Sequence, residues 1–527
     1  MKATLHVLLL QITFITFAQS AKILGIFHGY SGSHQHLGNK ILLELAARGH
    51  QVTAIVQRKF APKTANENYQ PIMIEYDSYL KSKCVTTNDP LFHCSLSTNL
   101  YKSAERGLLD TISSTAGTGL VWTELFFNQT SVQNLLKSNQ EFDMVILEEF
   151  LNDAFKGFCN FYTAHCVSVS VVGPSRFTNL QMGNPLNPSY MPEILSRYSS
   201  EMSFFQRLVN TFSIFFGVIN FYWSILPKHN EILQKNFPGS PPITELFYRT
   251  SLMLLNSHVS VSSPVPLVPN MIEIGGFHLN TPKELPRDLQ NYLDEAENGV
   301  IYFSMGSNLR GNDVEESKRN AIIKVFSQLK QRVLWKWEND TIPGQPDNVK
   351  LGKWLPQQDI LGHPNIKLFV THGGLLSIIE TIYHGVPIVG IPIFGDQEMN
   401  MAVVEADGYG KLLRFSALTE ETFRKALTEV LNNDKYKENA IRRSRIMHDQ
   451  PMKPLDRAMF WIEYVLRHEG APHLRTGALN LNWFQVLCLD VLTVIILIVA
   501  SFIFSTYCII NVVSRGYLKK QIKIKKR

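Results

Sequence analysis

Short apolar segments alternate with amphipathic segments along most of the 527 residues, and this alternation limits the possible folds more than any other feature. Residues 22–27 have the pattern of a buried strand, residues 39–48 that of a helix with one apolar face, and residues 51–56 that of the next strand. Strands that alternate with helices form largely parallel sheets with helices packed on their faces. The sequence therefore predicts an α/β fold.

A second alternating series follows the proline-rich stretch SPVPLVP at residues 263–269. Its predicted strands lie at residues 300–304, 333–337, 366–371 and 386–391. We expect two Rossmann-like domains that face each other across a cleft. The predicted boundaries are residues 21–268 for an N-terminal domain, 269–285 for a linker and 286–470 for a C-terminal domain.

The predicted loop at residues 28–38 separates the first strand from the first helix and carries His34 and His36. In open α/β sheets, ligands bind beyond the carboxyl ends of the strands. We therefore expect this loop to face the cleft.

Both ends of the chain differ in composition from the rest. Residues 1–20 combine a lysine, an apolar run and a small-x-small site at Ala18-Gln19-Ser20, which predicts a cleaved secretory signal peptide. Residues 491–510 contain no charge over twenty positions, which as a helix spans about 30 Å, the thickness of a bilayer core. We predict a transmembrane helix at residues 487–510.

The predicted tail at residues 511–527 is basic. Residues 515–527 contain seven Lys or Arg and no acidic residue, and subtracting these seven charges from the formal net charge of +6 leaves −1. The excess is local and does not indicate nucleic acid as a partner. Such a flank stays in the cytosol, so we expect a single-pass type I protein with its main part in a lumen.

Lys523 and Lys525, the fifth and third residues from the end, resemble a dilysine signal for the endoplasmic reticulum membrane. A plain stop-transfer cluster is the alternative. In an oxidising lumen, two pairs of cysteines at short spacing, Cys84 with Cys94 and Cys159 with Cys166, have the spacing to close small loops; free buried thiols are the alternative. Glycosylation sequons begin at Asn128 and Asn339, which predicts a glycoprotein.

Residues 204–226 are strongly apolar and aromatic, but Arg207 and Asn210 interrupt the run. We interpret the segment as a lid or membrane-apposed helix that lines an apolar pocket. An ordinary buried helix is the alternative.

The stretch FVTHGGLLSIIETIYHGVPIVGIPIFGDQ at residues 369–397 concentrates the groups that carry chemistry. A strand ends before His372, Gly373 and Gly374 permit close approach of the backbone, and a helix follows. The first turn of a helix exposes unpaired N–H groups and the positive end of its dipole, which bind anions. With Ser377 in that first turn, the stretch predicts a diphosphate site.

Three further polar residues extend this predicted site. Glu380, on the same helix, has a carboxylate that suits ribose hydroxyls, as in other nucleotide-binding folds. Asp396 and Gln397 follow the next strand and suit the hydroxyls of a sugar. Together these groups describe a nucleotide-sugar site.

The whole stretch resembles the signature of the UDP-glycosyltransferase family. His372-Gly373-Gly374, Glu380, Pro387, Pro392 and Asp396-Gln397 stand at the family's spacings, and matching segments elsewhere are SHQHLGNKILLELAARGH, VIYFSMGSN and KWLPQQDILGHP. In the overall character of its sequence, the chain most resembles membrane-anchored invertebrate members of the family. The resemblance implies a GT-B fold, with the acceptor substrate bound by the N-terminal half and the UDP-sugar mainly by the C-terminal half.

Roles in donor binding follow from the resemblance residue by residue. Trp354 is expected to stack on uracil with Gln357 beside it; a plain core aromatic is the alternative for Trp354. The remaining implied contacts are Ser307, His372, Gly374 and Ser377 with the diphosphate, Glu380 with the ribose, and Asp396 and Gln397 with the donor sugar. At position 376, where many relatives have an asparagine that touches phosphate, this chain has Leu376.

The resemblance also implies a general base. The matching histidine is His34, with His36 as its competitor, and the acid that orients it is Glu148, where many relatives have aspartate, or the adjacent Glu149. A neutral imidazole removes the proton from the acceptor hydroxyl while that hydroxyl attacks the anomeric carbon. This mechanism inverts the anomeric centre and releases UDP. We expect no metal and no cofactor, since no Asp-x-Asp motif or His/Cys cluster with ligand spacing occurs.

The favoured function is therefore an inverting hexosyltransferase of the detoxification type, acting on small lipophilic acceptors, with glucose preferred over glucuronic acid. The expected partners are the UDP-sugar donor, that acceptor and membrane lipid, with a homo-oligomer as a further option. Two alternatives are an enzyme that acts on UDP-sugars themselves, such as an epimerase, and a non-catalytic UDP-sugar-binding membrane protein of the same fold. Leu376 and Glu148 are the features that favour the non-catalytic alternative.

Overall fold

The computed structural model describes residues 20–29, 31–76 and 100–525. Most of the predicted signal peptide, Cys84, Cys94 and the last two residues of the tail lie outside these ranges. The chain forms two compact units, residues 1–474 and residues 475–527, which are described separately.

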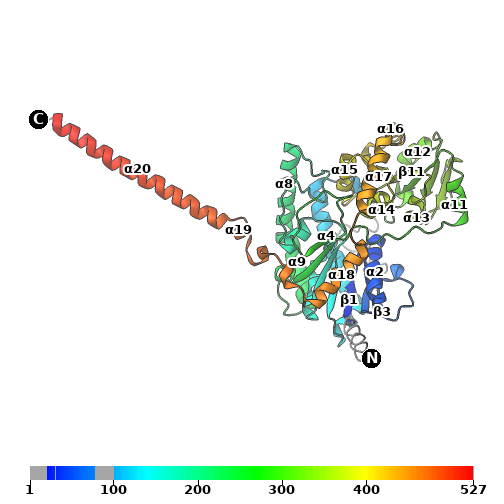
Figure 1. Ribbon diagram of the computed structural model, residues 1–527, viewed down its shortest axis with the longest axis horizontal. Helices are drawn as coiled ribbons and strands as arrows, with labels where there is room; N and C mark the ends of the chain where they lie inside the picture. The colour runs from blue at the N-terminus through cyan, green and yellow to red at the C-terminus, as the bar shows by residue number, and fades with distance from the viewer. Residues whose placement is uncertain (1–19, 30, 77–99, 526–527) are drawn as a thin grey trace, which may run out of the picture. The chain divides into compact units, whose positions relative to one another are not determined.

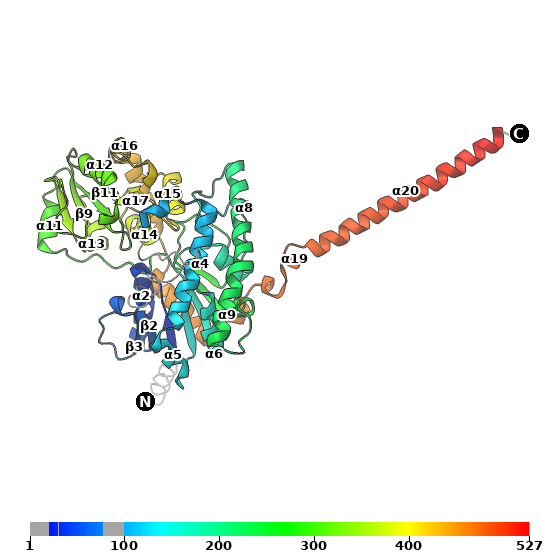
Figure 2. The same ribbon diagram turned by 180° about the vertical axis from the view of Figure 1, so that it is seen from behind.

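Unit 1 contains two parallel sheets (Figures 1 and 2). The first has seven strands in the order β3-β2-β1-β4-β5-β6-β7, and the second has six in the order β10-β9-β8-β11-β12-β13. The first sheet comprises β1 (Lys22–Ile26), β2 (Gln51–Gln57), β3 (Tyr69–Ile74), β4 (Met144–Glu149), β5 (His165–Ser170), β6 (Thr250–Leu255) and β7 (Met271–Glu273). The second comprises β8 (Val300–Ser304), β9 (Arg332–Lys336), β10 (Val349–Gly352), β11 (Ile366–Thr371), β12 (Ile388–Gly390) and β13 (Gly410–Leu412).

Helices cover both faces of each sheet. Those of the N-terminal half are α2 (Gly32–Ala47), α4 (Leu108–Phe127), α5 (Thr130–Lys137), α6 (Lys156–Phe161), α7 (Arg176–Met182), α8 (Phe204–Asn220), α9 (Leu226–Asn236) and α10 (Ile243–Phe247). Those that follow are α11 (Arg287–Asp294), α12 (Glu316–Phe326), α13 (Gln357–Leu361), α14 (Leu375–Tyr383), α15 (Gln397–Ala406), α16 (Glu420–Leu431), α17 (Asp434–His448) and α18 (Pro454–Arg467). The predicted α/β class and the two facing halves are confirmed.

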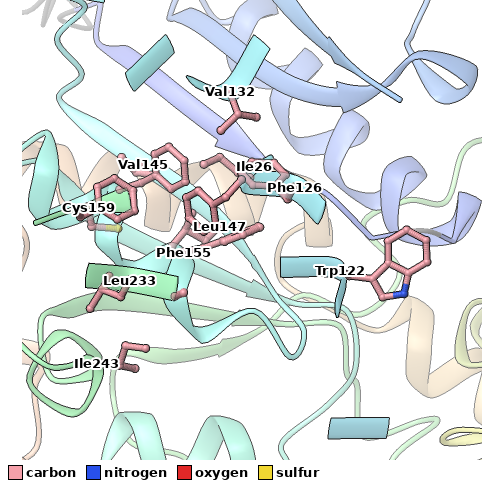
Figure 3. Close-up of a cluster of buried hydrophobic side chains, with 14 of the residues drawn as sticks. Ile26, Trp122, Phe126, Val132, Val145, Leu147, Phe155, Cys159, Leu233 and Ile243 are labelled. Atoms are coloured by element: carbon pink, nitrogen blue, oxygen red, sulfur yellow. The ribbon is translucent and has the colours of Figure 1, made fainter. Parts of the chain in front are cut away.

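Alternate residues of the first sheet supply two separate cores. Leu24, Ile26 and Leu147 point to one face, where α4 and α6 cover them with aromatic side chains and α9 with leucines (Figure 3). Ile23 and Ile146 point to the opposite face, which α2 and α18 cover. Because successive side chains of a strand point to opposite faces, a strand buried on both sides is apolar throughout.

Helix α18 ends the second half of unit 1 but packs on the first. Its apolar residues Ala458, Met459 and Ile462 belong to the core around Ile23, and Arg48 Nη2 on the cap of α2 donates to Asp456 Oδ1 over 2.8 Å. The range 286–470 expected for the C-terminal domain therefore includes a helix whose packing is N-terminal. Amphipathic spacing predicts a helix but does not identify the sheet that it covers.

The predicted strands 300–304 and 366–371 are confirmed at their exact bounds, whereas the first helix begins earlier than expected. Helix α2 starts at Gly32, so residues predicted as loop form its first two turns. Glycine, serine and histidine have modest helix propensity, but packing of Leu37 and Ile41 against the sheet outweighs it. His34 therefore projects from the first turn of a helix rather than from a loop.

The segment at residues 204–226 forms α8 and a following π-helical turn, and α8 has an exposed apolar face. Phe204, Leu208, Phe212 and Phe215 are all more than half exposed. The inner face is fixed by Asn210, whose Oδ1 accepts from the Glu193 N–H over 2.7 Å. The segment does not line the main cavity, so that part of the expectation is wrong, and the buried-helix alternative fails for the outer face.

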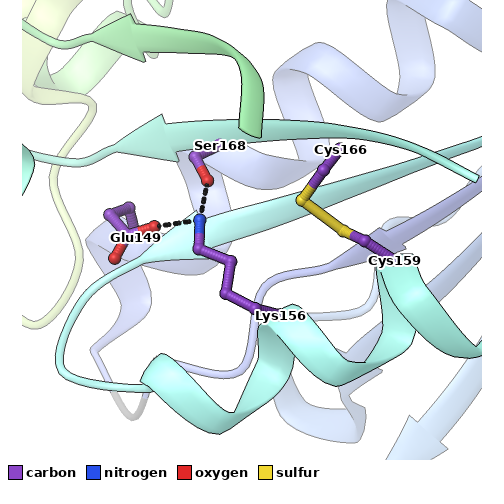
Figure 4. Close-up of a disulfide and its surroundings, with 5 residues drawn as sticks. All are labelled: Glu149, Lys156, Cys159, Cys166 and Ser168. Atoms are coloured by element: carbon purple, nitrogen blue, oxygen red, sulfur yellow. Dashed lines mark hydrogen bonds and ion pairs between the residues drawn. A yellow bond between two sulfur atoms is a disulfide. The ribbon is translucent and has the colours of Figure 1, made fainter. Parts of the chain in front are cut away.

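A disulfide joins Cys159 on α6 to Cys166 on β5, which decides for this pair between the crosslink and the free thiols that the spacing left open (Figure 4). The sequons at Asn128 and Asn339 begin on exposed residues, where a glycan would find room.

Unit 2 contains two helices, α19 (Trp483–Val486) and α20 (Leu489–Lys525). Residues 489–522 of α20 have a mean hydropathy of 2.5 in their most apolar window and are long enough to cross a membrane. Residues 204–236 of unit 1 pass the same test with a mean hydropathy of 1.4, but a third of that window is buried inside the protein. The apolar C-terminal helix is therefore confirmed.

Candidate active site

A cavity of roughly 1130 Å³ lies between the two halves of unit 1. Its lining includes ten of the eleven predicted site residues: His34, Ser307, Trp354, Gln357, His372, Gly374, Ser377, Glu380, Asp396 and Gln397. The eleventh, Glu148, is fully buried behind His34. The carboxyl ends of strands from both sheets thus contribute to one site.

Glu148 holds the imidazole of His34. Its Oε1 is hydrogen-bonded to His34 Nδ1, which leaves Nε2 as the free ring nitrogen. Its Oε2 accepts from the Gly29 N–H over 2.8 Å and lies 3.2 Å from His28 Nδ1. Burial alone would raise the pKa of Glu148, but His34 and His28 outweigh it and hold that pKa well below its usual range.

Gly29 permits this arrangement. A Cβ atom there would lie 2.6 Å from His34 Nδ1 and 2.7 Å from Glu148 Oε1, too close for any side chain. The backbone can therefore approach the pair of residues and donate its N–H only because position 29 is glycine.

The two competitors for these positions lie elsewhere. Glu149, next on β4, points to the other side of the strand, where Lys156 Nζ and Gln181 Nε2 donate to its carboxylate over 2.8 and 2.6 Å (Figure 4). His36 also lines the cavity, but its ring faces His278, with 6.3 Å between ring centroids.

His372 is packed between two glycines at the start of α14. A Cβ atom at Gly306 or at Gly374 would come within 2.6 Å of its ring, and Gly306 has a φ of +78° that favours glycine. Burial, together with the charge of Lys336, lowers the pKa of His372 to about 4. This histidine is therefore neutral at pH 7 and serves as a hydrogen-bonding group rather than as a cation.

Lys336 is a cavity residue that the sequence analysis missed. It ends β9, its Nζ donates to the Gly306 carbonyl over 2.5 Å, and it lies beside His372. Burial lowers the pKa of Lys336, while the charge of Glu338 opposes the shift. A basic residue at the carboxyl end of a parallel strand was the available signal.

Two glutamines hold Glu380. Gln357 Nε2 donates to Glu380 Oε2 over 2.5 Å and to Ser377 Oγ over 3.1 Å, while Gln358 Nε2 donates to Glu380 Oε1 over 3.1 Å. Burial raises the pKa of Glu380 to about 7, even though both hydrogen bonds oppose the shift. The carboxyl group is therefore close to half protonated at neutral pH.

Trp354 is 80% exposed, which excludes the core-aromatic alternative. Lys336 Nζ lies 5.8 Å from the centroid of its ring. An aromatic side chain exposed at the edge of a cavity has a face available for a flat ligand.

Asp396 and Gln397 line the cavity close to the start of α14, where Asn400 Nδ2 also donates to the Gly373 carbonyl over 3.1 Å. Asn400 Nδ2 donates to Asp396 Oδ2 over 2.7 Å, and burial raises the pKa of Asp396 while the charge of His34 lowers it. Gln397 Oε1 accepts from the N–H groups of Ile393 and Phe394 over 2.8 and 3.1 Å. The carboxamide oxygen of Gln397 thus holds the backbone of the loop before α15, and Gln397 Nε2 is the group that can bind a ligand.

Leu376 lines the cavity and packs against the apolar core of the N-terminal sheet. Asn308 Nδ2 donates to Ser31 Oγ over 3.1 Å across the same cleft. Leucine at position 376 therefore joins the two halves, whereas asparagine there would lose that apolar contact. Within the described ranges, no three His, Cys, Asp or Glu side chains gather as metal ligands.

Two parallel sheets that face one cleft, with the start of α14 on one wall and His34, held by Glu148, on the other, have the arrangement of a GT-B glycosyltransferase fold. A glycotransferase of kitacinnamycin matches with a TM-score of 0.55 at 16% identity, covering 85% of this chain and 99% of that chain. The calicheamicin glycosyltransferase CalG4 matches with a TM-score of 0.52 at 17% identity, again covering 85% and 99%.

The family is shown by sequence. The profile of the family described as "UDP-glucoronosyl and UDP-glucosyl transferase" matches residues 21–525. UDP-glycosyltransferase UGT5 of Dactylopius coccus is 38% identical over 94% of this chain and 92% of its own length, and UDP-glucosyltransferase 2 of the same species is 35% identical over 100% of both. UDP-glucuronosyltransferase 2B1 of Rattus norvegicus is 34% identical over 89% of both. The chain belongs to this family and is a UDP-glycosyltransferase.

Proposed function

We propose that this enzyme transfers glucose from UDP-glucose to a hydroxyl group of a small acceptor, with inversion at the anomeric carbon and His34 as the general base. The observation that carries the proposal is the hydrogen bond between Glu148 and His34 Nδ1 at the cavity wall. It orients the free Nε2 toward the space that the donor site also borders. An ionised carboxylate stabilises the imidazolium that forms when Nε2 accepts a proton.

The proposed reaction step needs no metal ion. The acceptor oxygen forms a bond to the anomeric carbon while its proton moves to His34 Nε2, and the bond from that carbon to the diphosphate oxygen breaks with its electron pair on UDP. The proton leaves His34 after the product departs. The metal-free mechanism remains a prediction of this proposal.

The charge that develops on the diphosphate would meet three groups. These are the free N–H groups at the start of α14, the neutral imidazole of His372 and the ammonium of Lys336. Fixed donors placed where charge develops are a major source of rate enhancement. Trp354 and Gln357 would hold the uridine, Ser307 and Ser377 the phosphates, Glu380 the ribose, and Asp396 with Gln397 the sugar.

Glucose is proposed over glucuronic acid because a relative that matches over its whole length is named a UDP-glucosyltransferase. UDP-glucuronosyltransferase 2B1 of Rattus norvegicus matches over less of both chains. We further propose that α20 anchors the enzyme in the endoplasmic reticulum membrane with unit 1 in the lumen. The apolar stretch of α20, its basic end and the disulfide in unit 1 support this placement.

The test measures UDP release from UDP-glucose by the full-length enzyme in detergent with a panel of phenols. His34→Ala is expected to lose at least about 10³-fold in kcat while UDP binding stays within about twofold. His36→Ala is the matched control on the same helix and should keep most of its turnover. Equal rates for wild type and His34→Ala would overturn the assignment of the base.

A further inference from the structure

We propose that the acceptor substrate is a compound with several hydroxyl groups, bound through them along one face of α4. This inference rests on the proposed function, because it concerns the acceptor half of the same cavity. The face is defined by Thr111, Ser114 and Thr118, which all line the cavity. Their spacing of three and four residues places them on one side of the helix.

Each hydroxyl group of this face already donates its proton to a backbone carbonyl of the helix region. Thr111 Oγ1 donates to the Gly107 carbonyl over 2.9 Å, Ser114 Oγ to the Thr111 carbonyl over 3.3 Å, and Thr118 Oγ1 to the Ser114 carbonyl over 2.8 Å. A hydroxyl has one proton and two lone pairs. Each oxygen therefore still accepts hydrogen bonds, and a ligand that satisfies it must supply O–H or N–H donors.

A close helix contact fixes this face beside the base of the cavity. A Cβ atom at Gly119 would lie 2.3 Å from Leu151 Cβ and 2.4 Å from the Leu151 carbonyl oxygen, so only glycine allows α4 to touch the loop after β4. Leu151 has a positive φ of 57° and itself lines the cavity. Thr118 thus adjoins the segment between Glu149, the last residue of β4, and Asp153.

The base of the cavity offers further polar groups. Ser170 lines it, is fully buried, and its Oγ has no hydrogen-bond partner among the residues that the structure describes. Ser170 is the register partner of Glu149 on the neighbouring strand, so both side chains point to the same face of the sheet. A buried hydroxyl without a partner is costly, and a ligand group that reaches it removes that cost.

Asp153 adds a carboxyl group at the same end. It lines the cavity, and His229 Nε2 lies 3.4 Å from Asp153 Oδ2. Burial lowers the pKa of His229 to about 3, so this imidazole is neutral at pH 7. Burial, followed by the charge of Glu149, raises the pKa of Asp153 to about 7, while the charge of Lys156 opposes the shift. Hydrogen bonds from ligand hydroxyls would favour its ionised form.

The remaining lining of this half mixes apolar side chains with polar and charged ones, namely Val171, Phe177, Ile194 and Leu195 among the former and Ser103, Arg106, Asp110, Ser113, Thr115 and Ser175 among the latter. A cavity that combines apolar walls with many hydroxyl and carboxyl groups matches a ring system with several hydroxyl groups along its edge. A simple lipophilic alcohol would leave the α4 hydroxyls and Ser170 unsatisfied.

Two flavones that share the 7-hydroxyl group test the inference with the full-length enzyme. Luteolin has three hydroxyls more than 7-hydroxyflavone, and we expect its kcat/KM to be at least about tenfold higher, the effect of two ordinary hydrogen bonds. The variant Thr111→Val/Ser114→Ala/Thr118→Val should reduce that ratio to within about twofold of one. The matched control is Thr123→Val, whose Oγ1 also donates to an α4 carbonyl, over 2.8 Å, but which does not line the cavity.

Equilibrium binding of both flavones in the presence of UDP separates this inference from the proposed function. Tighter binding of luteolin that disappears in the triple variant would support the α4 face even if no sugar were transferred. Turnover of both flavones with equal kcat/KM and equal affinity in the wild type would overturn it while the proposed function stood. A ratio that Thr123→Val lowers as much as the triple variant does would also overturn it.

Discussion

In the N-terminal wall of the cleft two imidazoles and a backbone N–H hold the carboxyl group of Glu148 ionised, whereas in the C-terminal wall burial brings Glu380 and His372 toward their uncharged forms. The difference follows what each wall must meet. A base that accepts a proton becomes positive and needs a fixed negative partner. In the proposed mechanism the C-terminal wall meets an anionic diphosphate, which favours backbone dipoles and the cation Lys336 over ionised carboxylates.

The largest effect is expected when the negative charge of Glu148 in the N-terminal wall is removed. Glu148→Gln keeps the shape of the side chain but removes the charge that stabilises the imidazolium, so kcat should fall on the order of 10³-fold with UDP affinity unchanged. Glu148→Asp retains the charge at a shorter reach and should lose less. Steady-state kinetics with UDP binding by calorimetry provide the measurement, and a Glu148→Gln enzyme with wild-type kcat would contradict the contrast between the walls.

The second effect concerns the protonation of Glu380. Its pKa is about 7 in the folded protein against 4.5 for the free side chain, so the folded state keeps a proton that the unfolded state releases between these pH values. Stability is therefore lost as pH rises through this window, by roughly 3 kcal/mol in total for this one group.

Glu380→Gln does not titrate and removes this loss. Its melting temperature relative to wild type, measured at matched pH in detergent, should rise between pH 5 and pH 8. A difference that stays constant with pH would show that Glu380 is ionised throughout, as Glu148 is on the other wall.

The third effect concerns the exposed aromatic edge of the C-terminal wall. Trp354→Ala should raise the KM for the UDP-sugar by roughly 10-fold to 100-fold, since stacking of a base on an aromatic side chain contributes about 1–3 kcal/mol. The value of kcat should change little, because stacking is equal in ground and transition states. Trp354→Phe should recover most of the loss, and an unchanged KM in Trp354→Ala would count against stacking.

The smallest effect concerns the positive charge of Lys336. Lys336→Met should raise the KM for the UDP-sugar by about tenfold at low ionic strength, whereas Lys336→Arg should stay closer to wild type. The same change removes the positive charge beside His372, so the pKa of that histidine, measured by NMR, should rise. A pKa of His372 that does not move would show that burial alone sets it.

Much of the fold could be predicted because strand and helix patterns are local. Strands β8 and β11 were predicted at their exact bounds, since each is a continuous apolar run between turn residues. The start of α2 was missed because its first turns lack apolar spacing and depend on packing against the sheet. The attachment of α18 to the N-terminal sheet was missed because an amphipathic helix carries no signal for its partner.

For the site, the sequence identified the residues that gather at the cavity but left some pairings open. Glu148 and Glu149 are neighbours on one strand and point to opposite faces, so only the assembled sheet shows which of them meets His34. Lys336 was missed because a single lysine at a strand end usually faces solvent. The paired glycines around His372 depend on two distant segments, which no local pattern connects.

The crosslink between Cys159 and Cys166 has a practical consequence for anyone producing the enzyme. It ties α6 to β5, and between these elements Lys156 links Glu149 to Ser168 beneath the cavity (Figure 4). Expression in a bacterial cytosol would leave both thiols reduced and α6 less constrained in the unfolded chain. Preparations from such hosts are expected to show weaker acceptor binding with normal UDP binding, a difference that reoxidation should reverse.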